Sequence, residues 1–158
     1  MNKSKSKGFT IVEVLIAMVI LAVGVLGLGV MQITSMQNTQ AGQMKALATI
    51  LAYDILDAMR ANPPGVSAGS YSIAMATATP TAPQCYWNAA NCDTTQLATS
   101  DVNRWRAALA QSLPSGNGSV ATSDLGTTTL ATVTINWVDP YSAADGNEQI
   151  VITSELLR

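Results

Sequence analysis

The chain contains no histidine among its 158 residues, only two cysteines and one phenylalanine, and only 11% of its residues are charged. Histidine is the commonest general acid–base residue of enzymes, and zinc sites draw mainly on histidine and cysteine ligands. No glycine-rich phosphate loop occurs, and the carboxylates are scattered through expected caps, turns and strand edges. The sequence therefore indicates a protein that is not an enzyme, with no metal, no cofactor and no small-molecule substrate.

The most prominent feature that is present is a long apolar run near the N-terminus. A head with three lysines, residues 1–7, is followed by Gly8 and then by apolar residues over 9–31, in which Glu13 is the only charged residue. An acidic residue in a membrane-length segment costs about 3 kcal/mol on insertion scales. Such a residue usually has a function, so Glu13 is a candidate functional residue.

Three interpretations of this segment compete. A secretory signal peptide has a basic head, but Val14 to Met31 is 18 residues without a polar side chain, longer than the usual core of about 7–15 residues. A plain membrane anchor needs about 20 apolar residues, which the run supplies. A class III leader would instead be cut on the cytoplasmic side, between Gly8 and Phe9.

The sequence KGFTIVEVLIA at residues 7–17 resembles the N-terminal signature of type IV pilins and of the pseudopilins of type II secretion. Its elements are a glycine, a phenylalanine that becomes methylated, apolar positions and a glutamate at the fifth mature position. The resemblance favours the class III leader. It implies that prepilin peptidase cuts after Gly8 and methylates Phe9, and that Glu13 pairs with the Phe9 ammonium of a neighbouring subunit.

The residue types at this junction also have a physical rationale. Gly8 lacks a side chain, so a peptidase can bind the backbone in an extended form with little steric cost. Glu13 near a helix end could alternatively reach towards lipid head groups. That alternative leaves the adjacent Gly8 and Phe9 unexplained.

The distribution of charge predicts the orientation in the membrane. After the lysines of the head, no Lys or Arg occurs before Lys45, so the head stays in the cytoplasm and the remainder is exported to the periplasm. Cys85 and Cys92 would then lie in an oxidising compartment, which favours a disulfide. Loss of the leader leaves five cations against ten carboxylates, a net charge of −5, which argues against nucleic-acid binding.

The helix is expected to continue beyond the membrane as far as Ala61, before the breaker Asn62-Pro63-Pro64-Gly65. Apolar residues recur at helical spacing and form one stripe: Ile33, Met36, Met44, Leu47, Leu51, Ile55 and Met59. The predicted organisation is a leader (1–8), a transmembrane half-helix (9–31), an amphipathic half-helix (32–62) and a periplasmic domain (63–158).

The glycines of the membrane segment allow two interpretations that the sequence leaves open. Gly24, Gly27 and Gly29 could permit close helix packing in the membrane. They could equally mark a segment that unwinds or bends when subunits pack into a fibre, because each glycine weakens a helix by about 1 kcal/mol relative to alanine.

The periplasmic region is expected to form an antiparallel sheet on the long helix, an α+β arrangement. A short strand is predicted at 71–75, a loop at 74–83, and a helix at 93–112 that begins with Asp93 and Gln96 as a capping box. A turn is expected at 116–118. Alternating residues predict strands over 131–137 and 150–156, with a possible third over 120–125.

The loop before the last strand holds oxygen ligands that could bind calcium: Asp139, Asp145, Asn147 and Glu148. Their spacing fits no EF-hand. A solvated hairpin loop around the Asp145-Gly146 turn signal explains them more simply, so no metal site is predicted.

The order of the cysteine pair, the helix around 103–106, the segment 113–116 and a strand with Trp137 resembles the minor pilins called type IV pilus modification protein PilV. This resemblance implies a low-abundance subunit that helps to initiate pilus assembly with other minor and major pilins at the inner-membrane assembly platform. No cysteine follows Cys92, so the C-terminal disulfide loop common in major pilins is absent. The alternatives are a minor pseudopilin of type II secretion and a membrane-tethered periplasmic binding module.

Overall fold

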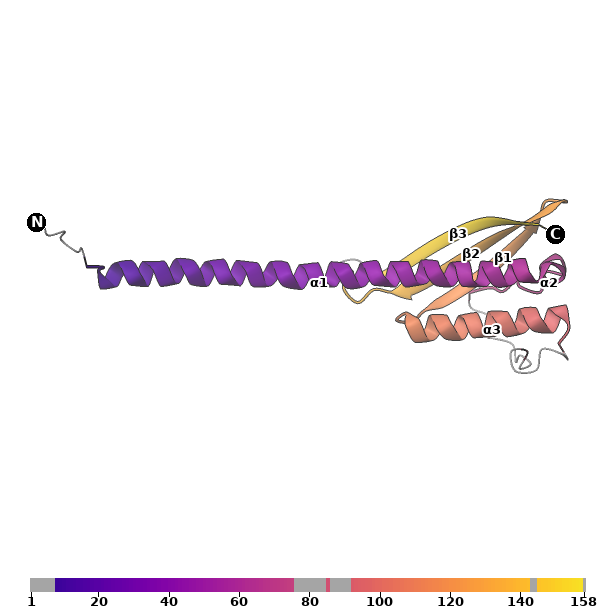
Figure 1. Cartoon of the computed structure of the whole chain (residues 1–158), viewed down its shortest axis with the longest axis horizontal. Coiled ribbons are helices and arrows are strands. Elements are labelled where there is room, and N and C mark those ends of the chain that lie inside the picture. Colours follow the sequence, from indigo (N-terminus) through magenta and orange to yellow (C-terminus); the bar gives the residue numbers. More distant parts are fainter. Residues whose placement is uncertain (1–7, 76–84, 86–91, 143–144, 158) are drawn as a thin grey trace, which may run out of the picture. The chain divides into compact units, whose positions relative to one another are not determined.

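The computed structural model describes residues 8–75, 85, 92–142 and 145–157 (Figure 1). The chain divides into two compact units, Met1–Gln40 and Ala41–Arg158, which are described separately. The elements in chain order are α1 (Ile11–Ala61), α2 (Pro63–Ser67), α3 (Thr94–Ser112), β1 (Asn117–Asp124), β2 (Thr128–Val138) and β3 (Asn147–Leu157). Among the described residues, the first unit contains residues 8–10 and the N-terminal part of α1.

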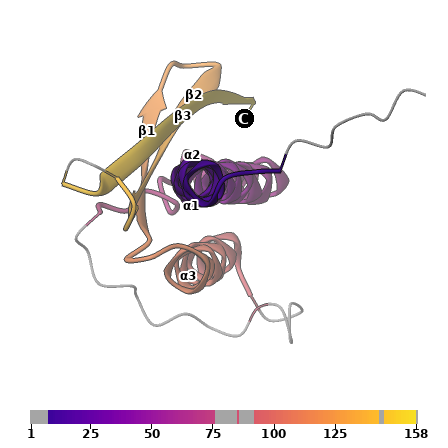
Figure 2. The same cartoon turned by 90° about the vertical axis from the view of Figure 1, so that its left-hand side faces the viewer.

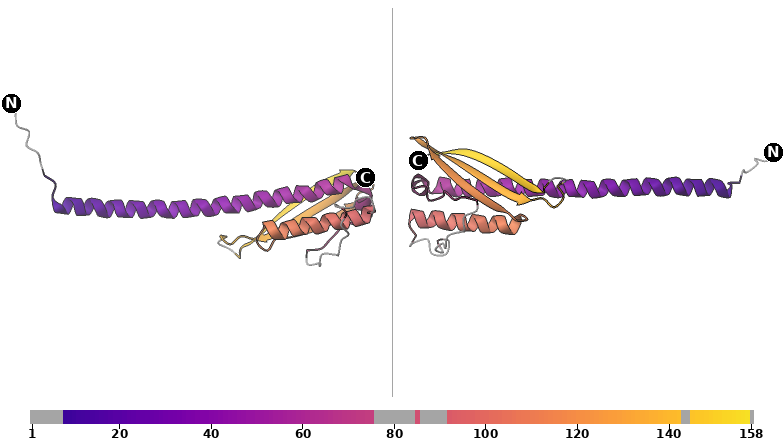
Figure 3. Two further views of the ribbon diagram at one scale, coloured as in Figure 1. Left: turned by 60° about the horizontal axis from the view of Figure 1, so that its bottom comes forward. Right: turned by 180° about the vertical axis from the view of Figure 1, so that it is seen from behind.

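The second unit is built on a three-stranded antiparallel sheet with strand order β1-β2-β3. Val133 in the central strand pairs with Val120 on one side and with Ile152 on the other. Burial alternates strictly along β2, because successive side chains point to opposite faces of a strand. The strands lie beside the part of α1 that belongs to this unit (Figure 3), so the expected α+β arrangement is confirmed.

One core joins α1, α3 and the sheet within the second unit (Figure 2). The sheet contributes Val120, Ala131, Val133, Ile135 and Trp137, α1 contributes Ala48, Ala52, Ile55, Leu56 and Met59, and α3 contributes Ala98, Val102, Trp105 and Leu109. All of these side chains are buried. Burial of this apolar surface is the main source of the unit's stability.

The predicted apolar stripe of α1 is wrong in part. Leu47 is 41% exposed, and Ile33 and Met36 are also exposed, whereas Ala48 and Ala52 are fully buried. Small residues allow neighbouring elements to approach a helix closely, and two tryptophans occupy the same core. The buried face of α1 therefore differs from the predicted stripe: it includes Ala48 and Ala52 and excludes Leu47.

The end of α1 and the start of α3 follow their local signals. Asn62 caps α2, whose first two positions are prolines. The side-chain amide nitrogen of Asn62 also donates to the Thr94 carbonyl at 2.8 Å. At the start of α3, the predicted capping box is confirmed. The Gln96 amide donates to the Asp93 carboxylate at 2.7 Å, and the Asp93 amide donates to the Gln96 side chain at 3.0 Å.

Two other local predictions are corrected. The strand expected at 71–75 is reduced to a single bridge between Ile73 and Val120. The turn expected at 116–118 lies earlier, where the Gly116 amide donates to the Leu113 carbonyl at 2.9 Å, and β1 begins at Asn117. A Cβ atom on Gly118 would lie 2.4 Å from a ring carbon of Trp105, so this glycine lets the strand pass directly over α3. Residues 76–83 of the expected loop lie outside the described residues.

Buried polar side chains connect the chain segments around the core. The Tyr71 hydroxyl donates to the Asp101 carboxylate at 2.6 Å. The Arg106 guanidinium donates to the Gly118 carbonyl through two nitrogens, at 3.2 and 2.8 Å, and also to the Ala74 carbonyl. Burial lowers the pKa of Arg106. Hydrogen bonds to carbonyl oxygens offset part of the cost of burying this cation.

Candidate processing and assembly site

The predicted cleavage junction lies just outside the long helix. Gly8, Phe9 and Thr10 are not helical, and α1 begins at Ile11. A Cβ atom on Gly8 would meet nothing within 4 Å, and the Phe9 side chain is 80% exposed. The peptide bond between Gly8 and Phe9 is therefore open to another molecule.

Thr10 sets the start of the helix, which the sequence reasoning missed. Its hydroxyl accepts a hydrogen bond from the Glu13 amide at 3.3 Å. Its carbonyl accepts from the amides of Glu13 at 3.1 Å and Val14 at 3.3 Å. Thr10 is thus the N-cap residue of α1. The signal was present in the sequence, since a Thr followed three residues later by a Glu is a capping-box pattern.

Glu13 is the third residue of α1 and its side chain is exposed. The positive end of the helix dipole favours a carboxylate at this position. Within the described part of the chain, the ion pairs join other residues and none involves Glu13. Gly8, Phe9 and Glu13 therefore lie at the N-terminal end of α1, where the Glu13 side chain is exposed.

Helix α1 is long and apolar enough to cross a membrane. Its most apolar window of 18 residues has a mean hydropathy of 2.9, and none of that window is buried. Gly24, Gly27 and Gly29, in the predicted membrane segment, are helical, and a Cβ atom at each would meet nothing within 4 Å. The single chain therefore leaves this apolar surface uncovered, and lipid or other helices would have to cover it.

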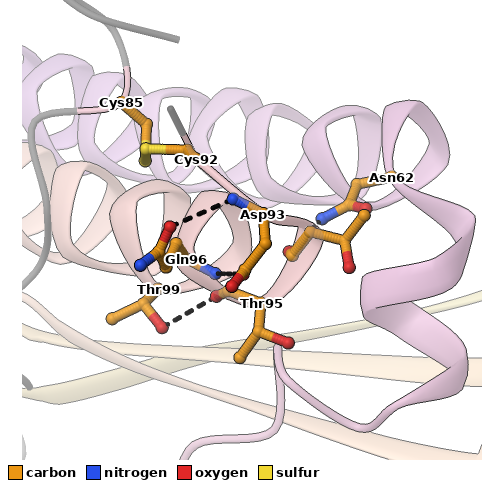
Figure 4. Close-up of a disulfide and its surroundings, with 8 residues drawn as sticks. Asn62, Cys85, Cys92, Asp93, Thr95, Gln96 and Thr99 are labelled. Atoms are coloured by element: carbon orange, nitrogen blue, oxygen red, sulfur yellow. Dashed lines mark hydrogen bonds between the residues drawn. A yellow bond between two sulfur atoms is a disulfide. The ribbon is translucent and has the colours of Figure 1, made fainter. Parts of the chain in front are cut away.

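The two cysteines are joined by a disulfide, with Cα atoms 5.8 Å apart (Figure 4). Cys85 is 1% exposed, and Cys92 directly precedes Asp93, the N-cap residue of α3. The bond therefore ties Cys85 to the residue that precedes the N-cap of α3. Both thiols are used, so neither is left to bind a metal ion.

Acidic side chains at 139–148 are engaged in hydrogen bonds and an ion pair within the protein. The Asp139 carboxylate accepts from the Tyr141 amide, and the Asp145 carboxylate accepts from the Asn147 amide. Hydrogen bonds from Asn147 also lower the pKa of Asp145. Glu148 pairs with Lys45 at 3.3 Å. Across the described residues, no cluster of acidic, histidine or cysteine side chains could hold a metal ion.

Comparison with protein families adds two adjacent matches. Residues 3–29 match the family model described as prokaryotic N-terminal methylation motif. Residues 30–103 match the family model described as type IV pilin Tt1218. Residues 30–103 are thus similar to a type IV pilin domain. Both matches support a place for this chain in the type IV pilin superfamily, whose members are structural subunits.

The methylation motif contains the whole junction described above. A pilin with this motif is processed by prepilin peptidase and assembles with other pilins. An exposed apolar helix is suited to membrane anchoring before assembly and to packing in a pilus afterwards. No curated protein and no solved structure matches the chain.

Proposed function

We propose that this pilin is a minor subunit that helps to initiate pilus assembly, as the PilV minor pilins are expected to do. It is inserted with residues 1–7 in the cytoplasm and its second unit in the periplasm. Prepilin peptidase cuts between Gly8 and Phe9 and methylates the new Phe9 amine. The mature subunit then leaves the inner membrane and joins the pilus on the cell surface.

The observation that carries this proposal is the combination of a non-helical Gly8–Phe9 junction with a lone carboxylate on Glu13. A charge in an apolar environment is costly unless it is paired. The ammonium group of Phe9 on a neighbouring mature subunit offers the matching charge. Pairing between subunits would offset the cost of both charges and would select processed subunits for assembly.

Mass spectrometry of sheared surface filaments tests the proposal. We expect peptides from this chain that begin at methylated Phe9. The variant Gly8→Val should retain the leader, because a side chain at this position would occupy the space in which the peptidase approaches the backbone closely. Filaments that never contain the chain, or an intact mass showing normal cleavage of the Gly8→Val variant, would contradict the proposal.

The variant Glu13→Gln separates assembly from processing. It keeps the size of the side chain but removes its charge, so cleavage should continue while incorporation into filaments falls. A membrane-tethered binding module would tolerate this change without loss of function. Chains that appear in a secretion apparatus and not in surface filaments would identify the pseudopilin alternative.

A further inference from the structure

We infer that Thr10 is a positioning residue for leader cleavage: by capping α1 it keeps the Gly8–Phe9 peptide bond outside the helix. The inference rests on the proposed cleavage at that bond. It adds a role for a residue between the cleaved bond and Glu13.

Thr10 makes the hydrogen bonds that are typical of the residue before the first turn of a helix. Its hydroxyl accepts a hydrogen bond from the Glu13 amide at 3.3 Å, one of the first N–H groups of the helix, which lack the regular partner four residues earlier in the helix. Its carbonyl accepts the first backbone hydrogen bonds of α1, from Glu13 and Val14. The backbone before this point, at Gly8 and Phe9, is consequently not helical.

The position of the helix start matters because of what a peptidase needs. In a helix, the backbone groups of each residue are engaged in intrahelical hydrogen bonds and are wrapped close to the axis. Hydrolysis requires water to attack the Gly8 carbonyl carbon, after which the Gly8 carboxylate and the Phe9 amine separate. That carbonyl is accessible only while the junction stays extended or irregular.

Without its cap, the helix would gain from extending backwards. Near an apolar environment, unsatisfied backbone N–H groups are costly, which favours additional helical hydrogen bonds. Alanine at position 10 removes the capping oxygen and has the highest helix propensity. Glycine also removes the oxygen, but it costs a cap only a few tenths of a kcal/mol and resists helix formation. Comparing the two substitutions therefore distinguishes an effect of where the helix starts from an effect of losing the threonine side chain.

The test measures cleavage of the full-length precursor in membranes by purified prepilin peptidase. We expect about a fivefold lower kcat/KM for Thr10→Ala, which is the order of the effect that a lost cap has on a helix equilibrium. Thr10→Ser restores the capping oxygen and should be cleaved at the normal rate. Thr10→Gly should also stay close to normal.

The outcomes separate this inference from the proposed function. Absence of cleavage in the natural chain would overturn the function itself. Normal cleavage of Thr10→Ala would overturn only the role of Thr10. An equal loss in Thr10→Ala and Thr10→Gly would also overturn it, because the peptidase would then be reading the side chain directly.

A second measurement reports on the backbone without the enzyme. The chain contains one phenylalanine, so ¹³C-phenylalanine labelling of the full precursor in detergent micelles gives a single set of signals from Phe9. The Cα shift of Phe9 should move towards the helical value in Thr10→Ala and stay unchanged in Thr10→Ser. An unchanged shift in Thr10→Ala would overturn the inference.

Discussion

The indole nitrogen of Trp105 donates a 2.9 Å hydrogen bond to the backbone carbonyl of Leu51. This contact joins α3 to α1 across 54 positions of sequence, and the Trp105 ring is fully buried. A buried indole N–H needs a partner, because leaving it unsatisfied costs free energy. The contact therefore helps to fix the position of α3 against α1.

Trp105→Phe should lower the stability of the second unit. Phenylalanine keeps an aromatic ring but loses the hydrogen bond to Leu51 and leaves part of the indole volume empty. We expect a loss of about 2 kcal/mol, measured by urea unfolding of the full chain in detergent. An unchanged unfolding midpoint would show that the hydrogen bond contributes nothing.

Gly118→Ala should also destabilise the fold, for a steric reason. The new Cβ atom would lie 2.4 Å from one Trp105 ring carbon and 2.8 Å from a Leu109 methyl carbon. Overpacking of this kind costs about 1–3 kcal/mol. The thermal midpoint of unfolding measures the effect.

Gly42→Ala is the matched control for that prediction. Gly42 lies within α1, and a Cβ atom there would meet nothing within 4 Å. Alanine should raise helix stability by about 1 kcal/mol. A similar decrease in the thermal midpoint for both variants would rule out the steric explanation for Gly118.

Replacing both cysteines by serine should destabilise the unit moderately. The bond between Cys85 and Cys92 closes a short loop, with a sequence separation of 7. Chain-entropy estimates for a loop of that length give about 2.5 kcal/mol. Chemical unfolding of the double variant, compared with the natural chain before and after reduction, measures the loss. Equal midpoints for the natural chain in both states would contradict the prediction.

The uncharged stretch of α1 should not tolerate a new charge. Between Glu13 and Lys45 the chain has no charged residue, and the Thr34 and Thr39 hydroxyls donate to carbonyls of their own helix. If this stretch packs between helices in a filament, Asn38→Asp buries an unpaired carboxylate. We expect its content in sheared filaments to fall several-fold, whereas Asn38→Gln should assemble normally. Equal incorporation of both variants would place Asn38 at the filament surface.

Features that depend on neighbouring residues were predictable from the sequence. The end of α1 before Asn62-Pro63 and the capping box of Asp93 and Gln96 each depend on about four positions, and the signature is contained in residues 7–17. The alternating strand β2 was also predictable, because the period of two identifies one buried face. The cap at Thr10 belongs to the same class, since its pattern was present and was overlooked.

Features that depend on distant contacts were decided only by the tertiary structure. The burial of Ala48 in preference to Leu47 reflects the approach of α3 and the sheet to one side of α1, which helical spacing does not specify. Gly118 enters β1 because Trp105 lies beneath it, and Arg106 is buried because carbonyls from two other segments surround its guanidinium. Local sequence determines where a helix or strand begins and ends, whereas the choice of buried face minimises the free energy of the whole core.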